Sequence, residues 1–184
     1  MSAQQLQVRF GGFGGQGIVL AGNLLGKAAS LYDGKEAVFT QAYGPEARGG
    51  ACRADVIVSN EPVDYPFVTQ PDVLAAMFQE AYAKFHGDLR PGGTLIIEED
   101  LVTPDTGETA MTLPATRIAE ELGNRIVANV VVLGALVAQT GIVSPGSVEE
   151  AIRNTLKPAA VELNLRAFAA GQAFDGAVPL EARV

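Results

Sequence analysis

The chain has 184 residues, a net charge of -8 and 48% hydrophobic residues. The length predicts one domain over residues 1–184, and the acidic balance excludes a nucleic-acid backbone or an anionic membrane as the main ligand, because either would repel the chain. The single cysteine, Cys52, excludes an internal disulfide, a C-x-x-C zinc site and an iron–sulfur cluster, so we expect a cytoplasmic protein without a metal site.

Two segments of the sequence indicate whether the chain is exported or inserted into a membrane. The N-terminal residues lack the basic and apolar regions of a signal peptide. The longest apolar run, residues 126–138, contains Asn129 and is shorter than the roughly 20 residues that a membrane-spanning helix needs. We expect this run to be a core or interface helix of a protein without a membrane segment.

The chain opens with a predicted strand, glycine loop and helix. Leu6, Val8 and Phe10 alternate with polar residues, as in a strand with one buried face, and the glycine-rich loop follows at once. Apolar residues then recur at helical spacing, and Asp33-Gly34 predicts the end of the helix. The residues on this helical face are Ile18, Ala21, Leu25, Ala28 and Tyr32.

Further strands and helices alternate along the chain. Short apolar runs typical of buried strands occur at 37–40, 55–59, 72–78 and 94–99, and residues 108–115 suggest a last strand. Residues 79–89 have helical character, and cap and stop residues predict helices over 125–140, from 145 and over 158–171. The predicted fold is therefore α/β and Rossmann-like, with a mostly parallel sheet and a helical C-terminal third.

The glycine loop has the pattern G-x-G-x-x-G. Gly12, Gly14, Gly15 and Gly17 permit positive φ angles and close approach, so the first backbone N–H groups of the helix can bind a phosphate or a carboxylate. The alternative is a tight turn that serves only to pack helix on strand. The pattern by itself leaves both interpretations open.

A dinucleotide site also needs an acidic residue about 20 positions later, at the end of the second strand. Asp33 lies in the turn before that strand and Glu36 at its beginning. Gln41 and Tyr43 occupy the place where the carboxylate belongs. The sequence therefore lacks half of an NAD site, although a stand-alone NAD-type oxidoreductase remains an alternative.

A second loop, "YGPEARGG" at 43–50, follows the second strand at the expected carboxyl edge of the sheet. α/β proteins bind ligands at this edge. Arg48 has a guanidinium that can bind a carboxylate or phosphate through two hydrogen bonds. The alternative is that Arg48 and Glu46 form a solvated surface pair.

Several stretches together resemble one family, the gamma subunits and equivalent domains of 2-oxoacid:ferredoxin oxidoreductases. The resemblance covers residues 8–171 and lies in "GFGGQGIVLAGNLLGKAA", "YGPEARGG", "ADVIVSNEPVDYP", "NRIVANVVVLGAL" and "LNLRAFAAG". "YGPEARGG" and "SNEPVDYP" are most similar to the 2-oxoglutarate enzymes, while pyruvate, indolepyruvate and branched-chain 2-oxoacid enzymes remain alternatives.

The resemblance implies oxidative decarboxylation of a 2-oxoacid to an acyl-CoA, with electrons passing to ferredoxin. Thiamine diphosphate, magnesium and iron–sulfur clusters are expected on alpha and beta partner subunits, with or without a ferredoxin-like delta subunit, and coenzyme A is the co-substrate. This chain has neither a G-D-G…N segment for the thiamine diphosphate magnesium nor cysteines for a cluster. We therefore expect no catalytic residue in this chain alone.

The implied role of this chain is to complete the active site from one side and to help place coenzyme A. An alternative is a structural subunit whose glycine loop is empty. Asn129 is expected to bond the glycine loop across the core, or else to contact the ligand directly. The residues implied to bind the ligand are Gly12, Gly14, Gly15, Gln16, Gly17, Tyr43, Glu46, Arg48, Gly49, Gly50 and Asn129.

Three other residues have simpler interpretations. His86, the only histidine, lies beside a helix-ending glycine, where a cation is favourable, and is not expected to be catalytic. Cys52 is expected to be a small buried thiol. Gly134 is expected to permit close packing of helices.

Overall fold

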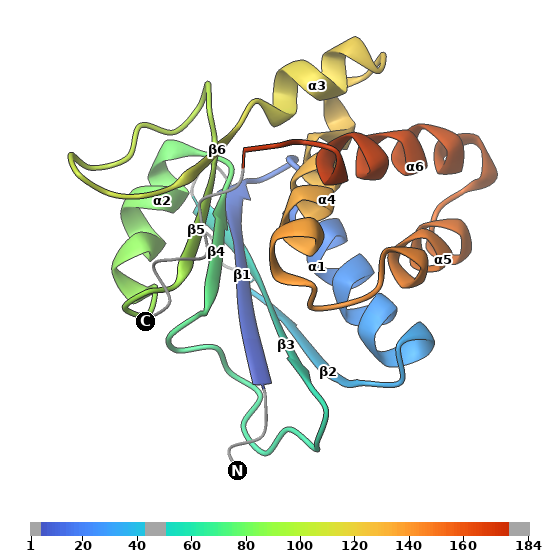
Figure 1. Ribbon diagram of the computed structural model, residues 1–184, viewed down its shortest axis with the longest axis horizontal. Coiled ribbons are helices and arrows are strands. Elements are labelled where there is room, and N and C mark those ends of the chain that lie inside the picture. Colours follow the sequence, from blue (N-terminus) through green and yellow to red (C-terminus); the bar gives the residue numbers. More distant parts are fainter. Residues whose placement is uncertain (1–4, 43–50, 177–184) are drawn as a thin grey trace.

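The computed structural model describes residues 5–42 and 51–176, and Figure 1 shows a twisted sheet between two unequal layers of helices. The strand order is β2-β3-β1-β4-β5-β6. β3 pairs antiparallel with β1 and β2, whereas the β1–β4, β4–β5 and β5–β6 pairs are parallel. The strands are β1 (Gln5–Phe13), β2 (Glu36–Gln41), β3 (Ala51–Ser59), β4 (Val73–Ala76), β5 (Thr94–Glu98) and β6 (Met111–Leu113).

The sheet confirms the predicted mostly parallel α/β fold, with two differences. β3 runs opposite to the other strands because the connection from Gln41 to Ala51 is shorter than the dozen or more residues that a parallel crossover needs. The second difference concerns Gly12. It pairs with Cys52 inside β1, so the predicted loop residue belongs to the strand.

Most helices follow the predicted start and stop signals, whereas α3 (Ala115–Glu121) was not predicted. Asn124 Oδ1 accepts a hydrogen bond from Ile126 N at 3.1 Å, Ser144 caps the next helix, and Gly141 ends α4 with a φ of 60°. All these caps were predicted from sequence. The helical elements are α1 (Ile18–Lys27), η1 (Ala28–Tyr32), α2 (Gln79–Phe85), η3 (His86–Asp88), α3 (Ala115–Glu121), η4 (Arg125–Val127), α4 (Ala128–Thr140), α5 (Pro145–Thr155) and α6 (Pro158–Gln172).

The two faces of the sheet pack against two separate cores, and alternate residues of β4 and β5 contribute to both. Val8 and Phe10 of β1 belong to the larger core, which includes residues of α1, α4, α5 and α6 on one face of the sheet. Gly11 faces the other side, where a β-carbon would lie 3.1 Å from the ring of Phe85. Tyr82 and Phe85 of α2 form the smaller core there with residues of β4 and β5. The glycine loop therefore extends from a strand that is buried on both faces.

Helices α4 and α6 approach each other closely through glycines. A β-carbon on Gly134 would overlap the carbonyl oxygen of Phe168, and one on Gly171 would overlap that of Val131. The prediction that Gly134 permits close helix packing is confirmed. Among the described residues, no helix combines the length and the hydropathy required to cross a bilayer.

Asp33 joins the end of the first helix to the start of α5. Its carboxylate accepts hydrogen bonds from Ser144 N at 2.6 Å, from Ser144 Oγ at 2.8 Å and from Ser147 Oγ. Burial raises the pKa of Asp33, but the hydrogen bonds from Ser147 and Ser144 and the charge of Lys35 outweigh it, so the pKa lies below its usual value. The charged carboxylate is thus the form that stabilises the fold.

We expect Asp33→Ala to lower the free energy of unfolding at pH 7 by about 1 kcal/mol, as for the loss of a helix cap. Because the folded pKa is depressed, the deficit relative to the unchanged chain persists down to about pH 4, the ordinary aspartate range, and disappears only at lower pH. Urea unfolding at several pH values measures it. The exposed Asp64 is the control: Asp64→Ala should show no such deficit, and equal losses in both variants would contradict the prediction.

Candidate functional site

The glycine loop forms a tight turn at the carboxyl end of β1. Gln16 N donates to Phe13 O at 3.1 Å, and Gly15 and Gly17 have φ angles of 98° and 75°. These left-handed conformations require glycine, since a β-carbon would strain them. Gly17 caps α1, so the unpaired N–H groups of the first helical turn begin at this loop.

Gln16 connects the loop to the neighbouring strand. Its Oε1 accepts from Phe13 N at 2.7 Å, and its Nε2 donates to Met77 O at 3.0 Å. Met77 N in turn donates to Gly11 O at 2.8 Å. The side-chain amide that the sequence assigned to ligand binding thus holds the loop in place, and its contact with a ligand stays a prediction.

Asn129 of α4 forms a hydrogen bond with the glycine loop. It is 1% exposed in α4, and its Nδ2 donates to Gly17 O at 2.9 Å. A β-carbon on Gly17 would overlap this nitrogen. The interpretation that Asn129 bonds the glycine loop across the core is confirmed, whereas direct contact of Asn129 with a ligand stays a prediction.

A largely apolar hollow of about 610 Å³ lies between the glycine loop, the last residues of β2 and the first residues of β3. Gly15 and Val19 line one side, and Phe39, Gln41 and Cys52 line the other. The Gln41 Oε1 atom is buried and accepts no hydrogen bond from the described residues. Burial raises the pKa of the half-buried Cys52 thiol, so this side chain remains a neutral apolar wall.

A second hollow, of about 430 Å³, lies on the other side of the same loop. It is lined by Met77 after β4, by Thr116 of α3 and by Arg125 and Ile126 of η4. Ile126 is 63% exposed and gives this hollow an apolar side chain that is open to solvent. No sequence pattern indicates a site at Arg125 or Ile126, because their proximity to Gly14–Gln16 depends on how α4 packs.

The second predicted loop begins and ends beside the first. Tyr43, Glu46, Arg48, Gly49 and Gly50 all lie outside the described residues. Their flanks are described: residue 51 pairs with residue 13 at the end of β1, and the N–H of residue 42 donates to the carbonyl of residue 53 at 3.2 Å. Both ends of the second loop are therefore at the carboxyl edge, next to the glycine loop.

The topology argues further against an NAD site. In a dinucleotide-binding fold the acidic residue ends the strand next to β1. Here the antiparallel β3 separates β2 from β1, and β2 ends in Gln41. Asp33 is bound to Ser144 and Ser147 at the opposite, amino edge of the sheet. Neither position supplies the ribose-binding carboxylate.

Comparisons with known proteins agree with this geometry. Residues 7–174 match the family "Pyruvate ferredoxin/flavodoxin oxidoreductase". The chain is 51% identical over 170 residues to the 2-oxoglutarate synthase subunit KorC of Methanocaldococcus jannaschii, covering 90% of this chain and 91% of the relative. It also superimposes on the gamma subunit of a keto/oxoacid ferredoxin oxidoreductase from Geobacter sulfurreducens, with a TM-score of 0.83, 46% identity, and 92% and 95% of the two chains covered.

A third match is the 2-oxoglutarate:ferredoxin oxidoreductase of Magnetococcus marinus, solved with 2-oxoglutarate, coenzyme A and succinyl-CoA bound. The TM-score is 0.82 and the identity 26%; the match covers 92% of this chain but 30% of that longer one. The family match, the identity to a curated subunit and the shared fold extend over nearly the whole chain. The chain therefore belongs to the pyruvate ferredoxin/flavodoxin oxidoreductase family and corresponds to its gamma subunit.

Proposed function

We propose that this chain is the gamma subunit of a 2-oxoglutarate:ferredoxin oxidoreductase in the cytoplasm, where it completes the active site from one side and helps to place coenzyme A. The complex converts 2-oxoglutarate to succinyl-CoA and passes electrons to ferredoxin. Alpha, beta and ferredoxin-like delta subunits are the proposed partners. The 51% identity to a 2-oxoglutarate synthase subunit supports this substrate over pyruvate, indolepyruvate and branched-chain 2-oxoacids.

The chemistry belongs to the partner subunits. Thiamine diphosphate with magnesium supplies the electron sink for decarboxylation, and iron–sulfur clusters carry the electrons. This chain has one cysteine in total, which is too few for a cluster. Its own residues bind and orient the co-substrate and exclude water.

The hollow between the glycine loop and the end of β2 is the observation that carries the proposal. The pantetheine arm of coenzyme A is a narrow, mostly apolar chain with two amides, which suits largely apolar walls that also carry the side-chain amides of Asn23 and Gln41. The Gln41 Oε1 acceptor is unpaired in the described structure. A buried acceptor without a partner costs about 1–3 kcal/mol, so an amide N–H of the ligand would relieve that cost.

The glycine loop supplies the complementary anion site. The N–H groups at the N-terminus of α1 favour a phosphate through hydrogen bonds and the helix dipole. A β-carbon added to Gly15 would meet no described atom within 4 Å, so the space beside this residue is open to a ligand. Arg48 is the proposed cation for the same phosphate.

The first experiment tests membership in the complex. The chain, tagged and purified anaerobically from its native host, is expected to bring larger subunits that contain iron and thiamine diphosphate. Assays of that complex with different 2-oxoacids should give the highest kcat/KM for 2-oxoglutarate. A colourless 19 kDa protein without partners would contradict the proposal.

The second experiment tests coenzyme A placement. We expect Gly15→Ala in the assembled complex to raise the KM for coenzyme A about tenfold, which corresponds to roughly 1.4 kcal/mol of binding, with the KM for the 2-oxoacid unchanged. Gly34→Ala is the matched control, since Gly34 also has a positive φ and open space but lies at the opposite edge of the sheet. If the two variants change the KM for coenzyme A equally, the glycine loop does not bind coenzyme A and its role is structural.

Gln41→Leu gives a more specific test, because it should weaken the binding of coenzyme A without lowering the stability of the fold. Removing the unpaired Oε1 should leave the free energy of unfolding unchanged or higher. The KM for coenzyme A should nevertheless rise severalfold, since the ligand amide loses its acceptor. An unchanged KM would show that Gln41 is not in contact with coenzyme A.

A further inference from the structure

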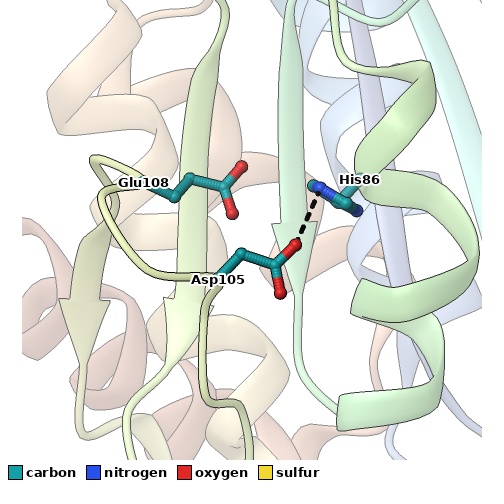
Figure 2. A group of neighbouring side chains, drawn as sticks. All are labelled: His86, Asp105 and Glu108. Atoms are coloured by element: carbon teal, nitrogen blue, oxygen red, sulfur yellow. Dashed lines mark ion pairs between the residues drawn. The ribbon is translucent and has the colours of Figure 1, made fainter.

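A cluster of three side chains that can bind a metal lies away from the glycine loop. His86 comes directly after α2, and Asp105 and Glu108 come from the connection between β5 and β6 (Figure 2). One donor atom from each residue lies within 4.8 Å of the other two. Strand β5 separates His86 from Asp105 and Glu108 along the chain, so no zinc-ligand spacing in the sequence indicates the cluster.

The His86–Asp105 pair has the separation of two metal ligands. His86 Nε2 and Asp105 Oδ2 are 3.4 Å apart, whereas a charge-assisted hydrogen bond measures about 2.7–2.9 Å. Bonds of about 2.0–2.2 Å from a tetrahedral Zn²⁺ to nitrogen and oxygen place neighbouring ligand atoms about 3.4 Å apart. A cation can therefore enter between these two atoms with little movement of either residue.

One buried tyrosine contacts all three residues. The ring of Tyr82 stacks on the imidazole of His86, with centroids 4.7 Å apart and planes 24° apart. Its hydroxyl accepts from Asp105 N at 2.9 Å and donates to the Glu108 carboxylate. Ligands of protein metal sites are oriented by such outer contacts. Figure 2 shows the three side chains directed toward one another.

The Tyr82 hydroxyl donates to one oxygen of Glu108 and leaves the other oxygen for a further partner. Tyr82 is a positioning residue in this arrangement, not a ligand.

We propose that His86, Asp105 and Glu108 bind one divalent transition-metal cation, with Zn²⁺ the best match. One imidazole nitrogen and two carboxylate oxygens form a three-ligand set that Zn²⁺ accepts, whereas Mg²⁺ and Ca²⁺ prefer oxygen ligands alone. The Asp105 side chain is 72% exposed, so water can reach the fourth position. The bound cation fastens the 99–110 connection to the end of α2.

Zinc titration of the tag-free, chelator-treated full chain tests the site. Calorimetry should show one Zn²⁺ per chain, and the thermal midpoint should rise with zinc concentration because the folded state binds the metal. Mg²⁺ and Ca²⁺ at the same concentration should produce neither effect. Absence of saturable zinc binding would overturn the proposal.

Single-residue variants show which side chains bind the zinc ion. His86→Gln and Asp105→Asn should each weaken zinc binding at least about tenfold, and Tyr82→Phe, which keeps the stacked ring, should weaken it about tenfold. Asp64→Asn, at an exposed aspartate outside the cluster, is the matched control and should bind as the unchanged chain does. Zinc binding that survives in both ligand variants would place the metal elsewhere and reject this site. Circular dichroism of each variant separates loss of a ligand from loss of fold.

Discussion

Gly134→Ala is expected to destabilise the fold by about 3 kcal/mol, the range found for forcing extra atoms into a well-packed interior. The added methyl group would overlap the carbonyl oxygen of Phe168, which belongs to the backbone of α6 and cannot rotate away. Helices α4 and α6 would have to separate along their contact. Urea unfolding of the purified chain measures the loss as a lower midpoint at constant slope.

Gly146→Ala is the control for this substitution. Gly146 also lies in a helix, near the start of α5, but a β-carbon there would meet no described atom within 4 Å. Alanine is the better helix former by up to about 1 kcal/mol, so the control should be neutral or stabilising. If both variants unfold at the same midpoint, α4 and α6 do not pack at the separation described here.

Arg9→Met is expected to cost about 3 kcal/mol, because the buried Asp55 carboxylate loses both hydrogen bonds from its nearest guanidinium. Arg9 is 1% exposed on the α2 face of β1. Its Nε and Nη2 lie 2.8 and 3.1 Å from the two oxygens of Asp55, its Nη1 lies 2.6 Å from Asp88, and Nη2 donates to Val68 O at 2.7 Å. In the variant, Asp55 retains the Arg53 guanidinium, with Nε 3.7 Å away.

Two further variants make this prediction specific to burial. Arg153→Met removes exposed pairs with Glu149 and Glu150 on the surface of α5 and should change the free energy of unfolding by less than about 1 kcal/mol. The double variant Arg9→Met/Asp55→Leu should recover part of the loss, because the buried Asp55 carboxylate is removed together with the guanidinium that binds it. A loss in Arg9→Met no larger than in Arg153→Met would contradict the prediction.

Local signals in the sequence predicted the elements well. Asn124, Ser144 and Pro158 begin helices and Gly141 ends one, as predicted, because capping depends on hydrogen bonds within a few residues along the chain. The glycine loop between a strand and a helix was predicted for the same reason. The direction of β3 was not, since its apolar residues suit a parallel or an antiparallel neighbour equally.

The sequence by itself determined the family, the alternation of strands and helices and the presence of the glycine loop, because these depend on residue order and short-range contacts. Only the tertiary structure placed Gln41 opposite Gly15 and brought His86 to Asp105. Each of these contacts depends on strand order and helix packing, which are decided by burial summed over many residues distant in sequence. A short stretch of sequence does not reveal which distant residues will pack together. The residues of the candidate sites are therefore brought into contact only in the folded chain.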